Sequence, residues 1–143
     1  MIRMKIFTAC LFLLFFPLHP ANDVFAGGTR EDCRVCGMWI DQYMHTRHVL
    51  VDADGNLLTF CSYTCAAGYM KKHAVNVKKL QAADYLTADL VDADKAYYLV
   101  GSDAPPVMSY TSIIAFAGIE TAADFQKQHG GRIMSLAEVQ AGY

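Results

Sequence analysis

Four cysteines form two close pairs, and the spacing within each pair suits a shared metal ion. Cys33 and Cys36 are separated by two residues and followed by Gly37, while Cys61 and Cys65 stand four residues apart. In a Cys-X-X-Cys turn both sulfurs can converge on one metal, and the glycine permits the tight backbone turn behind them. At the start of a helix an i, i+4 pair shares one face, about 5–6 Å apart. A mutual disulfide needs Cβ atoms about 3.8 Å apart. The two pairs together therefore predict a metal site.

Three other uses of these cysteines are open. Four thiolates could close a structural zinc site of the zinc-ribbon or treble-clef kind. Two disulfides could form instead if the chain is exported to an oxidising compartment. A thiol oxidoreductase is the third reading, although Cys36 does not lead an obvious helix in a βαβ context. Covalent haem is excluded because glycine, not histidine, follows Cys36.

Two methionines favour copper among the possible metals. Met38 follows Cys36 by two residues, and Met108 lies in a segment containing Pro105 and Pro106, where no apolar stripe explains it. Thiolate and thioether ligands together favour Cu(I), since zinc gains little from a thioether. Packing is the alternative for both methionines, because methionine commonly fills cores. Weaker ligand candidates are Met44, His45, His48 and His129.

Composition excludes several classes of protein. The 143 residues are 54% apolar and 18% charged, with a formal net charge of −2, which is typical of a folded domain. A chain without excess positive charge is not expected to bind nucleic acid. We find no Ser-His-Asp arrangement and no glycine-rich phosphate loop, so we expect a binding protein and not an enzyme. A calcium loop beginning at Asp52 is excluded because its twelfth position is Tyr63, where glutamate is required.

The N-terminus has the pattern of a cleaved signal peptide. Arg3 and Lys5 precede an apolar run over residues 6–16, and Val24 and Ala26 fit the small-residue rule before a cleavage site. This apolar run is too short to span a bilayer, which requires about 20 residues. Cys10 lies inside the run, so it does not fit a lipid-acylation site. We therefore expect residues 1–26 to be removed and residues 27–143 to form a periplasmic domain, without lipoprotein anchoring or other membrane attachment.

The elements that must position the cysteines form an internal duplication. The segment 50–55 (LVDADG) recurs as 90–95 (LVDADK), and strand-like runs flank each copy. We predict one β-hairpin from 48–51 and 57–60, and a second from 86–91 and 96–100. Each hairpin is followed by a helix, giving two ββα units side by side, at about 33–75 and 84–143. The predicted fold class is α+β, with small mixed sheets and packed helices.

Capping residues define the predicted helices. Ser62 can cap a helix that runs to about Lys72, and Thr121 can cap another that runs to about Gln128 and ends at Gly130. The prolines predict an irregular loop over 101–110. Residues 132–134 can add a strand and residues 136–140 a short helical turn.

These residues resemble the NosL family of nitrous oxide reductase accessory proteins, which are exported Cu(I) carriers. The resemblance covers nearly all of the mature chain, and the matching stretches are 33–38 (CRVCGM), 96–102 (AYYLVGS), Met108, 116–117 (FA), 123–125 (ADF) and 129–131 (HGG). It implies two ββα units and delivery of Cu(I) to a copper-receiving protein, nitrous oxide reductase or its assembly complex. The ligands that it implies are Cys33 or Cys36, Met38 and Met108.

Cys61 and Cys65 lie outside the family's core pattern. They are similar to the cysteine pairs of metal-sensing and heavy-metal trafficking modules, and with them four thiolates can meet. The leading hypothesis is an exported Cu(I) metallochaperone for a periplasmic copper enzyme, with Cys33, Cys36, Met38, Cys61, Cys65 and Met108 as metal ligands. The alternatives are an interaction module stabilised by Zn(II) or disulfides, and a general heavy-metal trafficking protein.

Overall fold

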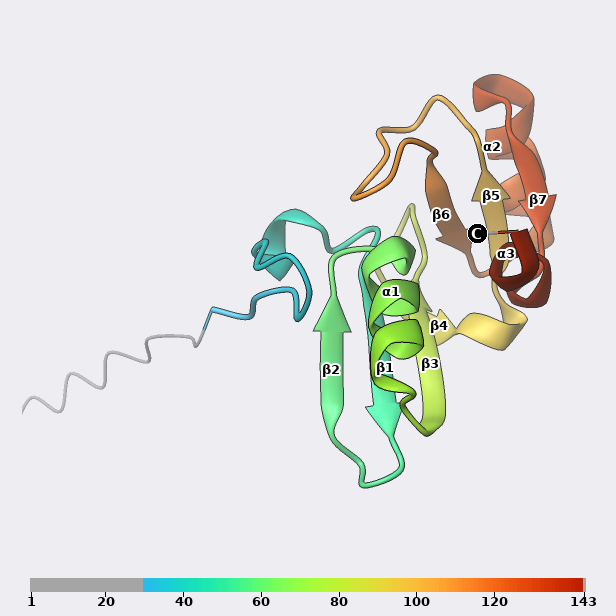
Figure 1. The fold of residues 1–143 in the computed structure, drawn as a ribbon. Coiled ribbons are helices and arrows are strands. Elements are labelled where there is room, and N and C mark those ends of the chain that lie inside the picture. Colours follow the sequence, from blue (N-terminus) through green and yellow to red (C-terminus); the bar gives the residue numbers. More distant parts are fainter. Residues whose placement is uncertain (1–29, 143) are drawn as a thin grey trace, which may run out of the picture.

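The computed structural model describes residues 30–142, in which two antiparallel sheets and three α-helices form an α+β fold (Figure 1). The expected signal peptide and Cys10 lie outside the described residues. The first sheet has the order β2-β1-β3-β4, with β1 at His48–Asp52, β2 at Leu57–Phe60, β3 at Val77–Ala83 and β4 at Leu90–Asp92. The second has the order β6-β5-β7, with β5 at Tyr97–Val100, β6 at Ile113–Phe116 and β7 at Arg132–Met134. The α+β prediction is confirmed, and the sheets are antiparallel and not mixed in strand direction.

The first unit begins with the predicted hairpin. β1 pairs with β2 in antiparallel register, His48 opposite Phe60. The Asp52 carboxylate accepts hydrogen bonds from the backbone N–H groups of Asp54 and Asn56, at 3.0 and 2.8 Å, and so fixes the connecting turn. Helix α1 (Tyr63–His73) follows, and the Ser62 hydroxyl accepts a hydrogen bond from the Cys65 N–H as predicted for an N-cap.

The second unit repeats this topology. Its strands β5 and β6 pair, helix α2 (Ile119–His129) follows, and β7 then pairs with the other edge of β5. In the first unit β3 likewise pairs with β1 after α1. Each unit is therefore two strands, a helix and a third strand. Helix α3 (Leu136–Gly142) comes last, and two short 3-10 helices lie at Ile40–Gln42 and Ala93–Lys95.

The predicted second hairpin is wrong. Strand β4 pairs with β3 of the first sheet, while β5 pairs with β6 and β7, and the 3-10 helix at Ala93–Lys95 carries the chain from one sheet to the other. The repeated LVDAD segment therefore marks different places, the end of β1 and the edge strand β4. Strand β3 was not predicted, because its first three residues, Val77–Lys79, are all exposed and show no alternation of apolar and polar side chains.

Helix α2 begins two residues before the predicted cap. Its N-cap is Gly118, and the Thr121 hydroxyl lies inside the first turn, donating to the Gly118 carbonyl at 2.9 Å. The hydroxyl thus satisfies an acceptor in the helix and does not cap a free N–H. The predicted end is confirmed: His129 is the last residue, and Gly130 follows with a left-handed φ of +69°.

One core joins the two units. Leu50, Phe60 and Tyr63 of the first unit pack with Tyr98 and Val139 of the second. Polar contacts cross the same junction, since the His48 Nε2 lies 3.2 Å from the Tyr98 hydroxyl oxygen. After β3 the chain passes β6, where the Tyr85 N–H donates to the Ala115 carbonyl and the Asp84 carboxylate accepts from the Ala117 N–H. The units are therefore fixed relative to each other.

The β5–β6 loop is irregular, as its prolines predict, and reaches from the second unit toward α1 (Figure 1). Its base is held by a hydrogen bond from the Gly101 N–H to the Ser112 carbonyl and by a hydrogen bond between the His129 Nδ1 and the Asp103 carboxylate at 2.8 Å. Gly131 packs directly beneath it, where a Cβ atom would stand 2.8 Å from the Ser102 nitrogen. These contacts anchor the loop that carries Met108.

Candidate metal centre

The first cysteine pair sits in a tight turn ahead of the first sheet. The Cys33 N–H donates to the Met38 carbonyl at 2.8 Å, and the Gly37 N–H donates back to the Cys33 carbonyl at 2.9 Å. Gly37 has a φ of +71°, a conformation that glycine adopts without strain. The Arg34 N–H donates to the Thr59 carbonyl of β2 at 3.2 Å, which ties the turn to the edge of the sheet. The turn therefore holds its two sulfurs against the end of β2.

The second pair lies where β2 passes into α1. Cys61 follows the last residue of the strand and is fully buried, and Cys65 lies in the first turn of the helix. The expectation that both are helical is wrong for Cys61, which precedes the N-cap Ser62. Their sulfurs are nevertheless 3.7 Å apart. The Thr46 hydroxyl donates to the Cys61 carbonyl at 2.8 Å and fixes the backbone at this corner.

All four sulfurs meet in one cluster. The Sγ atoms of Cys33, Cys36, Cys61 and Cys65 lie within 4.8 Å of one another, and the separation between Cys36 and Cys61 is 3.5 Å. All four cysteines are free thiols. A tetrahedral ion with metal–sulfur bonds of about 2.3 Å would place its sulfurs roughly 3.8 Å apart. The arrangement therefore fits a single metal ion with little adjustment.

The cluster is buried on one side only. Cys33 and Cys65 are each 3% exposed and Cys61 is fully covered, whereas Cys36 is partly exposed. An incoming ligand therefore reaches the cluster through Cys36, while the other three sulfurs are shielded from solvent.

A hydrogen bond between Cys61 and Cys65 shifts the pKa values of these two thiols in opposite directions. The Cys61 thiol donates to Cys65, and this bond lowers the pKa of Cys65 to about 6 against the opposing effect of burial. The same bond, reinforced by burial, raises the pKa of Cys61. Burial also raises the pKa of Cys36. Cys65 stands at a helix N-terminus, where a thiolate is favoured, so it carries the first negative charge of the cluster.

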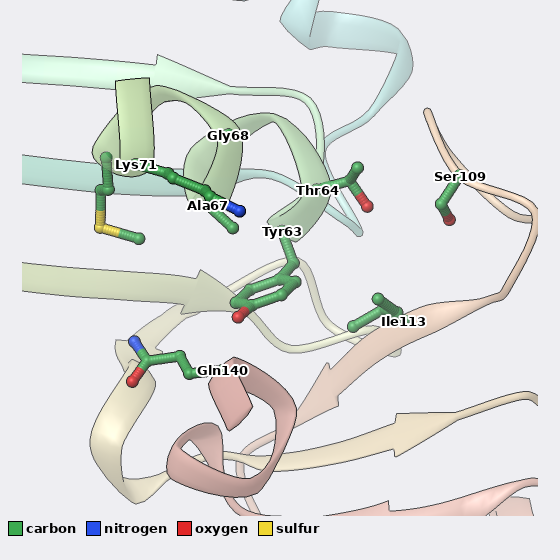
Figure 2. Close-up of a pocket in the computed structure, with 9 residues that line it drawn as sticks. Tyr63, Thr64, Ala67, Gly68, Lys71, Ser109, Ile113 and Gln140 are labelled. Atoms are coloured by element: carbon green, nitrogen blue, oxygen red, sulfur yellow. The ribbon is translucent and has the colours of Figure 1, made fainter. Parts of the chain in front are cut away.

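The two predicted thioether ligands occupy different environments. Met38 is partly buried and packs against the core that includes the cysteines. Met108 is 43% exposed and has a left-handed φ of +57° on the β5–β6 loop. Its neighbour Val107 packs against the same core, and Ser109 lies across from Thr64 of α1 (Figure 2). The loop therefore brings Met108 to the cysteine-bearing unit.

The weaker candidates from the sequence have other partners. His48 is buried between Thr46 and Tyr98, with its ring nitrogens 3.1 Å from the Thr46 carbonyl oxygen and 3.2 Å from the Tyr98 hydroxyl. His45 and His129 lie 2.9 Å from the Tyr85 carbonyl and 2.8 Å from the Asp103 carboxylate respectively. Met44 lies 3.4 Å from the Arg47 guanidinium. The hydrogen bond of Thr46 to Cys61 was missed, because no local sequence signal marks it.

Within residues 30–142 no helix is both long and apolar enough to cross a bilayer.

Comparison with known proteins identifies relatives over most of the chain. The family model described as NosL matches residues 25–143. The copper-binding lipoprotein NosL of Stutzerimonas stutzeri is 28% identical over 119 residues, which cover 76% of this chain and 62% of that protein. The chain thus spans less than two thirds of the length of this curated relative.

A solved structure shares this architecture. The crystal structure of the copper chaperone NosL from Shewanella denitrificans matches with a TM-score of 0.62 at 20% identity, covering 76% of this chain and 88% of that one. The solution structure of apo-NosL from Achromobacter cycloclastes matches with a TM-score of 0.49 at 22% identity, over 64% and 82% of the two chains.

Proposed function

The chain belongs to the NosL family, and on that premise we propose that it is an exported carrier that binds Cu(I) and passes it to a copper-receiving partner. The observation that carries the proposal is the convergence of four free thiols within 4.8 Å. Copper is the cargo of this protein, and the chain acts as a binding protein and not as an enzyme. Residues 1–26 serve as the export signal, and residues 27–143 form the copper-binding domain.

Soft donors in a half-open cluster suit a carrier of Cu(I). Thiolates and thioethers select Cu(I) over harder ions. Cys33, Cys61 and Cys65 are buried and anchor the ion, while the partly exposed Cys36 is the sulfur that an incoming ligand meets first. A transfer site needs this combination, because the ion must be held securely and still be accessible to the ligands of the recipient.

Met38 and Met108 act as exchangeable ligands in this proposal. Met38 follows the turn that holds Cys33 and Cys36, and its carbonyl is hydrogen-bonded to Cys33. Met108 lies on the β5–β6 loop, which reaches toward the first unit and is held at its base by the contact between Asp103 and His129. A thioether on a loop can leave the ion without disturbing the buried sulfurs. The two methionines therefore supply the labile side of the site.

The recipient that we propose is nitrous oxide reductase or its assembly complex, by analogy with the family. The relative from S. stutzeri is named a copper-binding lipoprotein, and the one from S. denitrificans a copper chaperone. Neither name specifies a recipient, so the identity of the partner rests on family membership.

A structural zinc site is the second candidate function. Two sulfur–sulfur separations, 3.5 and 3.7 Å, lie close to the roughly 3.8 Å edge of a tetrahedral Zn–thiolate site. In that case zinc would stabilise the first unit and the protein would act as an interaction module. Removal of the metal would then unfold the unit, and the methionines would play no part.

Single methionine variants separate the two functions. We expect Met38→Ala and Met108→Ala to weaken Cu(I) binding about tenfold each, which corresponds to about 1.4 kcal/mol, and to change the rate at which a chromogenic Cu(I) chelator removes the ion. Met134→Ala is the matched control, because Met134 lies on β7 of the second sheet. If Met108→Ala leaves both affinity and transfer rate unchanged, its proposed role is wrong.

A further inference from the structure

A hollow of about 520 Å³ separates α1 from the second unit (Figure 2). Sites for small organic ligands span about 300–1,000 Å³. The hollow opens between helix α1, the β5–β6 loop, strand β6 and helix α3. Its lining consists of Tyr63, Thr64, Ala67, Gly68, Met70, Lys71, Ser109, Ile113 and Gln140.

A glycine in the middle of α1 lines this hollow. Gly68 lies inside the helix, where glycine is about 1 kcal/mol less favourable than alanine. A Cβ atom at this position would meet no atom within 4 Å, and Gly68 does not have a positive φ. Neither backbone strain nor crowding therefore requires glycine. Gly68 lines the hollow and leaves open space where a side chain would begin.

The lining of the hollow carries one charged side chain beside several neutral polar ones. Lys71 is the charged side chain of the lining, and it pairs with no carboxylate of residues 30–142. Tyr63 is only 2% exposed, yet its hydroxyl makes no hydrogen bond to the part of the chain that the structure describes. Figure 2 shows the Tyr63 ring between α1 and Gln140. Among the described residues no fully buried side-chain oxygen or nitrogen lacks a partner, so the unpaired Tyr63 hydroxyl keeps some exposure at the hollow, where it is available to a ligand.

We propose that the hollow binds an organic carboxylate with an apolar body. The Lys71 ammonium supplies the counter-charge, and the Tyr63 hydroxyl donates a hydrogen bond to the polar end of the ligand. Ala67, Gly68 and Ile113 offer apolar surface to the rest of the molecule. The same chemistry is presented by a free aromatic acid and by the C-terminal carboxylate of a peptide that ends in an aromatic residue.

Binding is measured by calorimetry and by amide chemical shifts of the reduced protein. The probes are 2-naphthoate, its neutral analogue 2-naphthamide, and a short peptide ending in phenylalanine with a free or amidated C-terminus. We expect saturable binding of at least one of the two carboxylates, with shifts at the lining residues, and at least fivefold weaker binding of its neutral form. Whichever carboxylate binds more tightly identifies the source of the natural ligand.

Two variants test the assignment of the site. Gly68→Leu fills the hollow and should abolish binding, while far-UV circular dichroism shows the helix retained. Lys71→Met should weaken binding at least fivefold, and Lys72→Met is the matched control because this lysine is exposed and does not line the hollow. The proposal is overturned if neither carboxylate binds at millimolar concentration, or if the two lysine variants weaken binding equally.

Discussion

Acid should weaken the junction between the two units through one buried imidazole. His48 is 1% exposed, and Tyr63 and Tyr98 pack against its ring. Its Nδ1 faces the Thr46 carbonyl, which only accepts, so Nδ1 carries the hydrogen and Nε2 accepts from the Tyr98 hydroxyl. A charged ring would lose this acceptor. Burial lowers the pKa of His48 to about 4, although the hydrogen bond to Thr46 opposes the shift.

The size of the effect follows from the difference in proton uptake. In the unfolded chain a histidine has a pKa of about 6.5. As the pH falls from 6.5 toward 4, the unfolded chain binds a proton at this residue and the folded protein does not, so stability decreases through this window. At about 1.4 kcal/mol per pH unit, His48 alone should remove roughly 2–3 kcal/mol of the free energy of unfolding between pH 7 and pH 4.5. Above pH 6.5 it should contribute no dependence on pH.

Urea unfolding of the reduced, metal-free protein measures this contribution. His48→Gln keeps groups that can hydrogen-bond and cannot titrate, and His73→Gln is the exposed control. We expect the wild type to lose roughly 2–3 kcal/mol more than His48→Gln between pH 7 and pH 4.5, and His73→Gln to follow the wild type. Equal pH dependence in wild type and His48→Gln would refute the reasoning. So would a midpoint near 6.5 for His48 in an NMR titration of the wild type, which needs no variant.

Three further predictions follow from the geometry. Gly131→Ala should lower the free energy of unfolding by more than about 2 kcal/mol, because a Cβ would stand 2.8 Å from the Ser102 nitrogen. Gly130→Ala has open space around it and should lower the free energy of unfolding by about 1 kcal/mol. Equal shifts of the two variants in thermal unfolding would contradict this prediction. Ser62→Ala should cost about 1 kcal/mol in urea unfolding through the lost helix cap, and no loss would mean that the cap is not formed. Zinc binding at pH 7.5 should release fewer than four protons in calorimetry across buffers, because the hydrogen bond from Cys61 lowers the pKa of Cys65 and favours its thiolate before the metal binds. Release of four protons would contradict this.

The local parts of the fold could be predicted from the sequence. The turn at Asp52, the cap at Ser62 and the end of α2 at Gly130 each depend on side chains within a few residues, so their signals are complete in the sequence. Strand partners are not local. Strand β4 pairs with β3 and not with β5, and the amino-acid composition of β4 does not predict which strand it pairs with.

The candidate site divides in the same way. The spacing of each cysteine pair predicts two sulfurs that can share a metal, but the meeting of the pairs depends on tertiary contacts, such as the hydrogen bond from the Arg34 N–H to the Thr59 carbonyl of β2. Met108 could be proposed as a ligand from its place in the proline segment and from the family resemblance, but the approach of its loop to α1 depends on tertiary contacts that the sequence does not show. The hollow beside α1 depends on the packing of the two units, so nothing in the sequence near Gly68 predicted it.

The most direct test of the central claim is a competitive titration of the reduced protein with Cu(I) and Zn(II) under anaerobic conditions. The number of ions per chain and their affinities are compared between wild type and the Met38→Ala, Met108→Ala double variant. We expect Cu(I) to be preferred and its affinity to fall in the double variant. Tighter binding of Zn(II), unaffected by the methionines and required for folding, would contradict a copper carrier and assign the four thiols to structure.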